Sequence, residues 1–102
     1  MDCNRQFRYD GLDMELRDLR CFVSVYEANS FGRAAVALNT TQSNVSARIG
    51  RLEQELGGPL FLRLHRSIAP TAKGQLAYRY AKGVIEVADE AVESIRNNVA
   101  AA

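Results

Sequence analysis

Residues 41–58 read TQSNVSARIGRLEQELGG, and this stretch predicts a helix with two unlike sides. At about 100° per residue, its apolar side spans about 60° and consists of Val45, Ile49, Leu52 and Leu56. The opposite side consists of Ser43, Ala47, Gly50 and Gln54. A solvated helix face usually carries charged residues, and a glycine within a helix costs about 0.5–1 kcal/mol relative to alanine. The small side chains therefore predict that a bulky, flat surface approaches this helix closely.

The size and composition of the chain are those of one globular domain. Its 102 residues are 47% hydrophobic and 25% charged, which argues against overall disorder. No stretch approaches the roughly 18 consecutive apolar residues that a membrane span needs. The first residues, MDCNRQFRYDGLD, contain no apolar core of a signal peptide, so we expect a cytoplasmic protein.

Reactive side chains are too few for an enzyme or a metal site. Cys3, Cys21 and the single His65 match no zinc spacing, and there is no glycine-rich phosphate loop or catalytic Ser-His-acid order. We therefore predict no catalysis, no metal, no cofactor and no small-molecule site. Free thiols in a reducing compartment are the simplest interpretation of the cysteines, with redox sensing by Cys21 as the alternative.

Positive charge is concentrated in the middle of the chain. Residues 1–41 and 74–102 each carry a net charge of −1, whereas five basic and two acidic residues give residues 42–73 a charge of +3. The five basic residues are Arg48, Arg51, Arg63, Arg66 and Lys73. Any one of them alone would be interpreted as a solvated surface charge, but their clustering favours contact with the phosphates of a nucleic acid.

Two short amphipathic helices are predicted before the quoted stretch, the first of about 12 residues and the second of two turns. Their apolar residues are Leu16, Leu19, Phe22, Val23 and Tyr26 in the first, and Phe31, Ala34, Ala35 and Leu38 in the second. Asn29-Ser30 ends the first helix, and Ser30 is placed to cap the second. The alanines allow another helix to pack at short distance. Thr41 is placed to cap the quoted helix. The second helix and the quoted helix are thus two short helices joined by a short turn, which is typical of a helix-turn-helix.

A small hairpin is predicted after the quoted helix, which Gly57-Gly58 ends because glycine accepts the left-handed conformation. In PLFLRLHRSIAPT, three leucines alternate with Phe61, Arg63 and His65, which predicts a short strand. A turn at Arg66-Ser67 and a return strand come next. Pro70 restricts the return strand to a sheet edge.

Thr71 opens a long helix, predicted from Ala72 to about Asn98 and roughly 40 Å long. Its apolar stripe repeats every three or four residues, close to a coiled-coil seam, and consists of Leu76, Tyr80, Val84, Val87, Ala91, Ile95 and Val99. Three short helices cannot cover a stripe of this length. The simplest partner is a second copy, so we predict a homodimer through this helix.

These elements predict a mainly α fold in three parts. Residues 14–71 form a winged helix-turn-helix of three short helices and a two-stranded wing, residues 72–102 form a linker and dimerisation helix, and residues 1–13 form a loose extension. The motifs SFGRAA, QS..VS, RLEQELGG.LF and T..G, between Leu16 and Gly74, resemble the N-terminal DNA-binding region of the LysR-type transcriptional regulators. The resemblance implies sequence-specific binding of double-stranded DNA with an interrupted inverted repeat, for transcriptional regulation. It also implies that the long helices pair antiparallel and set the half-site spacing.

The resemblance implies roles for individual residues as well. The helix after Thr41 would enter the major groove, with Gln42, Ser43 and Ser46 facing base edges, while Arg66 on the wing would reach the minor groove. Together with the clustered basic residues, the candidates for backbone and minor-groove contacts are Thr40, Thr41, Arg48, Arg51, Arg63, His65, Arg66, Thr71 and Lys73. For His65, a plain surface histidine is as good an interpretation.

The chain departs from the family pattern in the quoted helix. Many relatives have Ser-Arg-Gln where this chain has Ser46-Ala47-Arg48, and often a basic residue at the position of Gly50. This argues against a direct arginine–guanine contact, whereas Ala47 can pack on a thymine methyl group and Gln42 can read adenine. In the wing, Pro70 replaces a usual leucine.

Full-length family members continue into a ligand-binding domain that resembles periplasmic binding proteins. We therefore expect this chain to be an excised DNA-binding domain or a truncated natural form, without inducer sensing. An alternative function is a protein-interaction module that forms mixed dimers with full-length regulators. Since both functions predict self-association, only affinity for DNA separates them.

Overall fold

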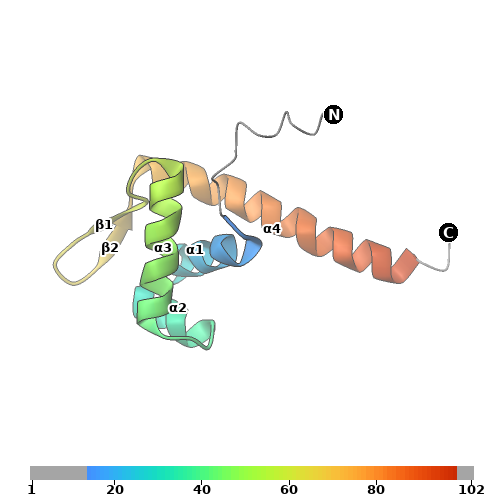
Figure 1. The fold of residues 1–102 in the computed structure, drawn as a ribbon, viewed down its shortest axis with the longest axis horizontal. Helices are drawn as coiled ribbons and strands as arrows, with labels where there is room; N and C mark the ends of the chain where they lie inside the picture. Colours follow the sequence, from blue (N-terminus) through green and yellow to red (C-terminus); the bar gives the residue numbers. More distant parts are fainter. Residues whose placement is uncertain (1–13, 99–102) are drawn as a thin grey trace.

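The computed structural model describes residues 14–98, which fold into four helices and a two-stranded antiparallel sheet (Figure 1). The elements are α1 (Leu16–Ala28), α2 (Phe31–Ala37), α3 (Gln42–Leu56), β1 (Phe61–Arg63), β2 (Ile68–Pro70) and α4 (Ala72–Asn98). The predicted winged helix-turn-helix with a long final helix is confirmed. The predicted N-terminal extension with Cys3, and Val99 of the long stripe, lie outside the described residues. Within the described range, no helix has the length and apolar character that a membrane crossing requires.

Helix α1 is the centre of the fold, because α2, α3 and α4 all pack against it. Its buried arc is therefore wider than the predicted stripe: Cys21 and Val25 are buried together with Phe22 and Val23. Leu16, which was predicted to lie on the stripe, is 38% exposed. It is the first residue of α1 and lies at the end of the helix.

The apolar side of α3 faces the other two short helices. Val45 and Ile49 are fully buried, and Leu52 is 1% exposed. On α2, Ala34 and Ala35 are also buried, which agrees with the predicted close approach of another helix. The side of α3 that the sequence predicts to be apolar thus forms the core of the domain.

The predicted breaks between the helices are confirmed at the level of single hydrogen bonds. Ser30 and Thr41 each accept a bond from the backbone N–H three residues later, at 3.0 and 3.1 Å. Asn29 and Asn39 adopt the left-handed conformation with φ of 54° and 57°, which asparagine tolerates better than most residues. Leu38 was predicted to belong to the second helix, but α2 ends one residue earlier, so Leu38 is the C-cap and remains 37% exposed.

The wing is shorter and more exposed than its leucine pattern predicts. Strands β1 and β2 pair antiparallel with Phe61 opposite Pro70, so Pro70 lies on the edge of a two-stranded sheet as predicted. Phe61 is buried, but Leu62 and Leu64 are about half exposed, at 51% and 52%. The hairpin leaves the body of the domain after Phe61, and neither face of its tip is covered (Figure 1).

A junction of short contacts joins the wing to α3 and α4. Leu60 N donates to the Glu53 carboxylate at 2.9 Å, which ties the start of the wing to α3. Thr71 Oγ1 donates to the Pro59 carbonyl at 2.8 Å and accepts from Gly74 N at 2.9 Å. A Cβ atom on Gly74 would overlap the carbonyl oxygen of Leu60. Threonine and glycine are thus both required where α4 leaves the wing.

Helix α4 spans 27 residues and extends well beyond the domain. It lies along α1 as far as Asp89, which pairs with Arg20, and Ala81 in this part is 2% exposed. The last turns of the helix project away from the three short helices (Figure 1). The wing projects at the opposite end of the molecule.

Gly74→Ala is expected to lower the free energy of unfolding by about 2 kcal/mol or more, since the methyl group would displace backbone atoms rather than a flexible side chain. Urea denaturation measures this. The control is Gly50→Ala, which meets no atom within 4 Å and should raise stability by about 0.5–1 kcal/mol. Equal effects of the two substitutions would contradict the close contact at Gly74.

Candidate nucleic-acid interface

The outward side of α3 consists of small or uncharged side chains. Ser43, Ala47, Gly50 and Gln54 are all exposed. A Cβ atom at Gly50 would meet nothing within 4 Å, so no contact inside the chain requires glycine there. Because glycine in a helix interior destabilises it, an external surface that approaches closely remains the best explanation.

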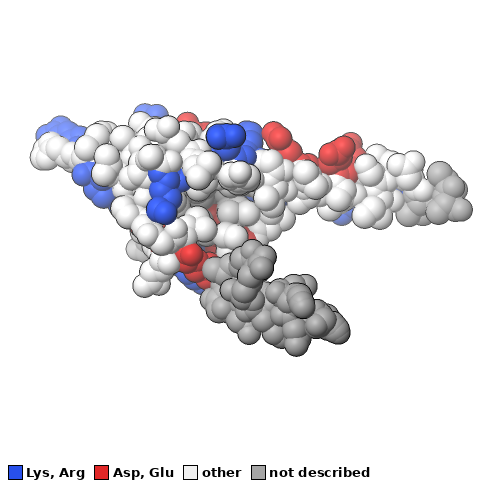
Figure 2. Space-filling view, turned by 90° about the horizontal axis from the view of Figure 1, so that it is seen from above, with Lys and Arg blue, Asp and Glu red and all other residues white. Residues whose placement is uncertain are grey.

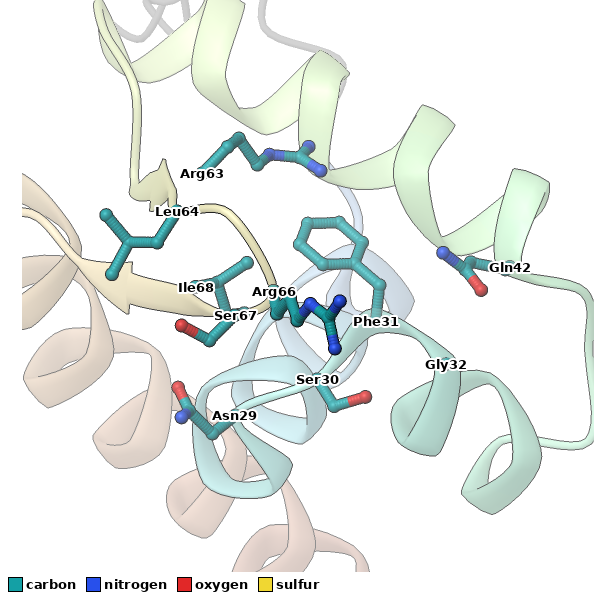
Figure 3. A pocket seen from close by; sticks show the side chains of 10 residues that line it. All are labelled: Asn29, Ser30, Phe31, Gly32, Gln42, Arg63, Leu64, Arg66, Ser67 and Ile68. Atoms are coloured by element: carbon teal, nitrogen blue, oxygen red, sulfur yellow. The ribbon is translucent and has the colours of Figure 1, made fainter.

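A groove of about 470 Å³ opens between the start of α2 and the wing (Figure 3). We call it the Phe31 groove; its lining residues are Asn29, Ser30, Phe31, Gly32, Gln42, Arg63, Leu64, Arg66, Ser67 and Ile68. Gln42 enters it from the first turn of α3, and Arg66 enters it from the wing (Figure 3). The groove thus joins one predicted base reader to the predicted minor-groove residue.

Arg63 is held at the rim of this groove by an aromatic ring. Its guanidinium carbon lies 4.2 Å from the centroid of the Phe31 ring, a cation–π contact. Within the described residues, neither Arg63 nor Arg66 forms a salt bridge. Their charges are therefore not neutralised by carboxylates, and both arginines line the groove that Gln42 enters from the first turn of α3.

The three short helices, the wing and the start of α4 match a known protein family. Residues 16–75 match the model of the bacterial regulatory helix-turn-helix proteins of the lysR family. The chain belongs to the lysR family. The match covers α1 through the first turn of α4, which includes the outward side of α3 and the Phe31 groove.

Individual relatives of this LysR-family chain are regulators. It is 45% identical over 83 residues to the transcriptional regulator BudR of Klebsiella aerogenes, covering 81% of this chain and 58% of BudR. It is 47% identical over 77 residues to the transcriptional regulator CzcR of Bacillus anthracis, covering 76% of this chain and 27% of CzcR. The chain therefore spans only about a quarter to three fifths of the length of these relatives.

Two solved structures with similar folds contain DNA. The BenM_DBD/catB site 1 DNA complex matches with a TM-score of 0.81 and 38% identity, over 84% of this chain and 96% of that one. The CbnR_DBD–DNA complex matches with a TM-score of 0.78 and 34% identity, over 87% of this chain and all of that one.

Arg48 of the LysR-family chain points inward rather than toward the outward side of α3. Its Nη1 donates to Asp18 Oδ1 at 2.9 Å, and Arg51 Nη2 lies 3.8 Å from the same oxygen. Asp18 is 1% exposed, and its other oxygen accepts from Glu15 N at 3.0 Å. The arginine that comes after Ala47 therefore ties α3 to α1, and the prediction that it contacts phosphate loses support.

The sequence analysis did not identify Asp18 as part of this arrangement. An acidic residue in the first turn of a helix suggests only a favourable interaction with the helix dipole. Its partner Arg48 lies 30 residues away, and no local pattern indicates that pairing.

The three threonines predicted to lie near phosphates differ in whether their hydroxyl hydrogen is still free to be donated. Thr41 accepts from Asn44 N, and Thr40 accepts from Asn44 Nδ2 at 3.0 Å, so both retain a hydrogen to donate. Thr71 donates its hydrogen to the Pro59 carbonyl. Thr71 is therefore a structural residue of the junction, with no donor left for a phosphate.

The remaining candidates for contacts with the DNA backbone, His65 and Lys73, do not lie at one place. His65 is exposed at the tip of the wing, beside Arg66. Lys73 instead lines a different, apolar groove between α1, α3 and α4. Figure 2 shows basic side chains on the wing and the body of the domain, and acidic side chains along the projecting part of α4.

The apolar stripe of α4 is exposed, as expected if a partner covers it. Among its large side chains within residues 14–98, the exposed fraction runs from 48% at Val84 to 67% at Tyr80 and Ile95. The stripe continues into the apolar groove of about 310 Å³, whose lining includes Met14, Leu19, Leu56, Leu76 and Tyr80. Periodicity within one helix could not reveal this groove, because its residues come from separate elements.

Cys21 is buried, with 2% of its surface exposed. Burial is the main cause that raises the pKa of its thiol, so little thiolate is present at neutral pH. Since the thiolate is the reactive form, the structure argues against redox sensing by Cys21.

Asp18→Ala is expected to lower the free energy of unfolding by about 2–3 kcal/mol, because it removes charged hydrogen bonds to both α3 and the start of α1. Arg48→Ala should cost about 1 kcal/mol, since the Asp18 carboxylate would lose a bond that water can only partly replace. Denaturant unfolding at equal protein concentrations measures both. Arg66→Ala, on the exposed wing, is the control and should change stability by less than about 0.5 kcal/mol. An unchanged stability of Arg48→Ala would return Arg48 to the candidates for phosphate contact.

Proposed function

We propose that this chain binds double-stranded DNA sequence-specifically as a homodimer and regulates transcription. The observation that carries the proposal is the thin, exposed side of α3 on the same helix whose first turn, through Gln42, meets the two arginines of the Phe31 groove. Support comes from the similarity to the solved DNA complexes of BenM_DBD and CbnR_DBD. Such a protein would act in the cytoplasm, on the nucleoid.

Helix α3 would lie in the major groove with its thin side toward the bases. Gln42 at its first turn would read adenine through its side-chain amide, and Ala47 would pack on a thymine methyl group. Ser43 and Ser46 would donate or accept hydrogen bonds at neighbouring base edges. Because Arg48 is bound to Asp18, no guanine contact is assigned to it.

The wing would place Arg66 in the adjacent minor groove, whose negative potential attracts arginine when the groove is narrow. Arg63 at the rim of the Phe31 groove would contact a phosphate, as would Arg51, which is 47% exposed. Thr40 and Thr41 would donate their remaining hydrogens to phosphates beside the first turn of α3. His65 and Lys73 stay candidates for weaker backbone contacts.

The dimer would form through the exposed stripe of α4, with residues Leu76, Tyr80, Val84, Val87, Ala91 and Ile95 at the interface. The charges of α4 favour an antiparallel pair. Its first half carries Lys73, Arg79 and Lys82 and no acidic residue. Its second half carries four acidic residues and one arginine. Antiparallel pairing brings the basic half of each helix beside the acidic half of the other, and the two binding units would meet an interrupted inverted repeat.

Selection of bound duplexes from a random pool, followed by anisotropy measurements against the selected duplex at several salt concentrations, tests DNA binding. The logarithm of affinity should fall with the logarithm of salt concentration by about 0.9 per phosphate neutralised, for roughly four to six phosphates per half-site. Gln42→Ala should weaken binding by about 1–3 kcal/mol and relax specificity at one base pair. Gly50→Ala, although more stable, should bind less tightly because its methyl group faces the groove floor.

Negligible binding to any duplex at low salt would favour the alternative, a module that forms mixed dimers with full-length regulators. The exposed stripe of α4 supports self-association in either case. Equal weakening of all sequences by Gln42→Ala would remove that residue from the base readers.

The chain is expected to be a dimer at micromolar concentration, and Val87→Glu should make it monomeric because it places a charge in the middle of the stripe. Light scattering measures the mass. Val36→Glu is the matched control, since Val36 is 81% exposed on α2 and far from the stripe along the chain. A monomeric wild-type chain at about tenfold higher concentration would contradict the dimer.

A further inference from the structure

A cluster of polar and aromatic side chains joins α4 to α1. The ring of Tyr78 stacks on that of Tyr26, with centroids 4.0 Å apart and planes 8° from parallel. The Tyr78 hydroxyl donates to Glu27 Oε2 at 2.6 Å, and Lys82 Nζ donates to the same oxygen at 2.8 Å. The hydrogen bond from Lys82, followed by that from Tyr78, lowers the pKa of Glu27, which keeps it charged. We call these four residues the Tyr78 clamp.

A second contact holds α4 farther along its length. Arg20 Nη2 donates to Asp89 Oδ1 at 2.7 Å. Asp89 lies about 16 Å beyond Tyr78 along the helix. Since two separate points determine a line, the clamp and this ion pair set both the position and the direction of α4 on α1. Between them, the small and buried Ala81 lets the two helices approach closely.

The Tyr78 clamp is continuous with the Phe31 groove through a row of aromatic rings. Tyr26 contacts Phe22 and Phe61, with centroids 6.0 and 6.5 Å apart. Phe61 in turn contacts Phe31 with centroids 5.9 Å apart. A packed row of rings transmits displacement instead of absorbing it. The direction of α4 is therefore fixed relative to the elements proposed to hold DNA.

A small change of direction at the clamp has a large effect at the far end of α4. Ile95 lies about 25 Å beyond Tyr78 along the helix. A tilt of about 10° there moves the far end by about 4 Å, which exceeds the rise of one base pair, about 3.4 Å.

We propose that Tyr78, together with Glu27 and Lys82, is a positioning element that sets the spacer length between the two half-sites which the dimer accepts. This inference rests on the proposed function, because it needs a DNA-bound dimer that pairs through α4. The clamp residues themselves need not touch DNA.

The test compares two affinities for each variant by fluorescence anisotropy. One is the affinity for a duplex with a single selected half-site. The other is the ratio of affinities for the selected duplex and for duplexes whose spacer is one base pair longer or shorter. The wild-type chain should prefer its own spacer by about tenfold or more, since one base pair rotates a half-site by about 35°. Tyr78→Leu and Glu27→Gln should reduce the preference to about threefold or less, with single-half-site affinity unchanged.

Tyr78→Phe is the matched control, because it keeps the stacked ring and the Glu27–Lys82 ion pair and removes one hydroxyl group. It should retain most of the spacer preference. The inference is overturned if Tyr78→Leu and Glu27→Gln both keep the wild-type preference, or if they weaken single-half-site binding as much as they weaken the preference. A wild-type chain that binds no duplex would overturn the proposed function instead, so the two failures are distinguishable.

Discussion

The buried side of α3 determines the geometry of the whole site. Val45, Ile49 and Leu52 pack between α1 and α2 with almost no exposed surface, so the orientation of α3 about its own axis is set by the core. A helix rotates as a unit, and burial of one side therefore presents Ala47 and Gly50 to the outside without any contact of their own. The two caps and the link from Glu53 to the wing only have to fix where α3 begins and ends and how the chain continues into the wing.

Internal contacts divide the arginines of this segment into two groups. Arg48 and, more loosely, Arg51 are drawn toward the buried carboxylate of Asp18. Arg63 and Arg66 have no carboxylate partner within the described residues, and both line the Phe31 groove. Each charge near the core is thus balanced by a specific partner, as low-dielectric surroundings demand. Arg63 and Arg66 on the wing, together with the half-exposed Arg51, are therefore left to face an external anion.

Helix α4 has two different surfaces, one that packs on α1 and one that is an exposed apolar stripe. Its first half is held on α1 by the Tyr78 clamp and by small residues such as Ala81. Its apolar stripe begins at the groove between α1, α3 and α4, and its large side chains stay exposed from Leu76 to Ile95. An exposed apolar stripe of this length is unfavourable in water unless a second surface covers it. The hydrogen bonds of the Tyr78 clamp, by contrast, are all formed within one chain. The helix is therefore rigidly oriented and still available for association.

Features that depend on neighbours a few residues apart could be predicted from the sequence. The helices, the caps at Ser30 and Thr41, the turn at Gly57 and the thin side of α3 all follow from periodicity and backbone preference. Helix packing, by contrast, decided which polar side chains are already bound to partners inside the chain. The pair of Asp18 with Arg48, the bond from Thr71 to the Pro59 carbonyl and the Tyr78 clamp join residues 12 to 55 positions apart. Such contacts arise only in the folded chain, because their partners are chosen by distance in space and leave no periodic trace along the sequence.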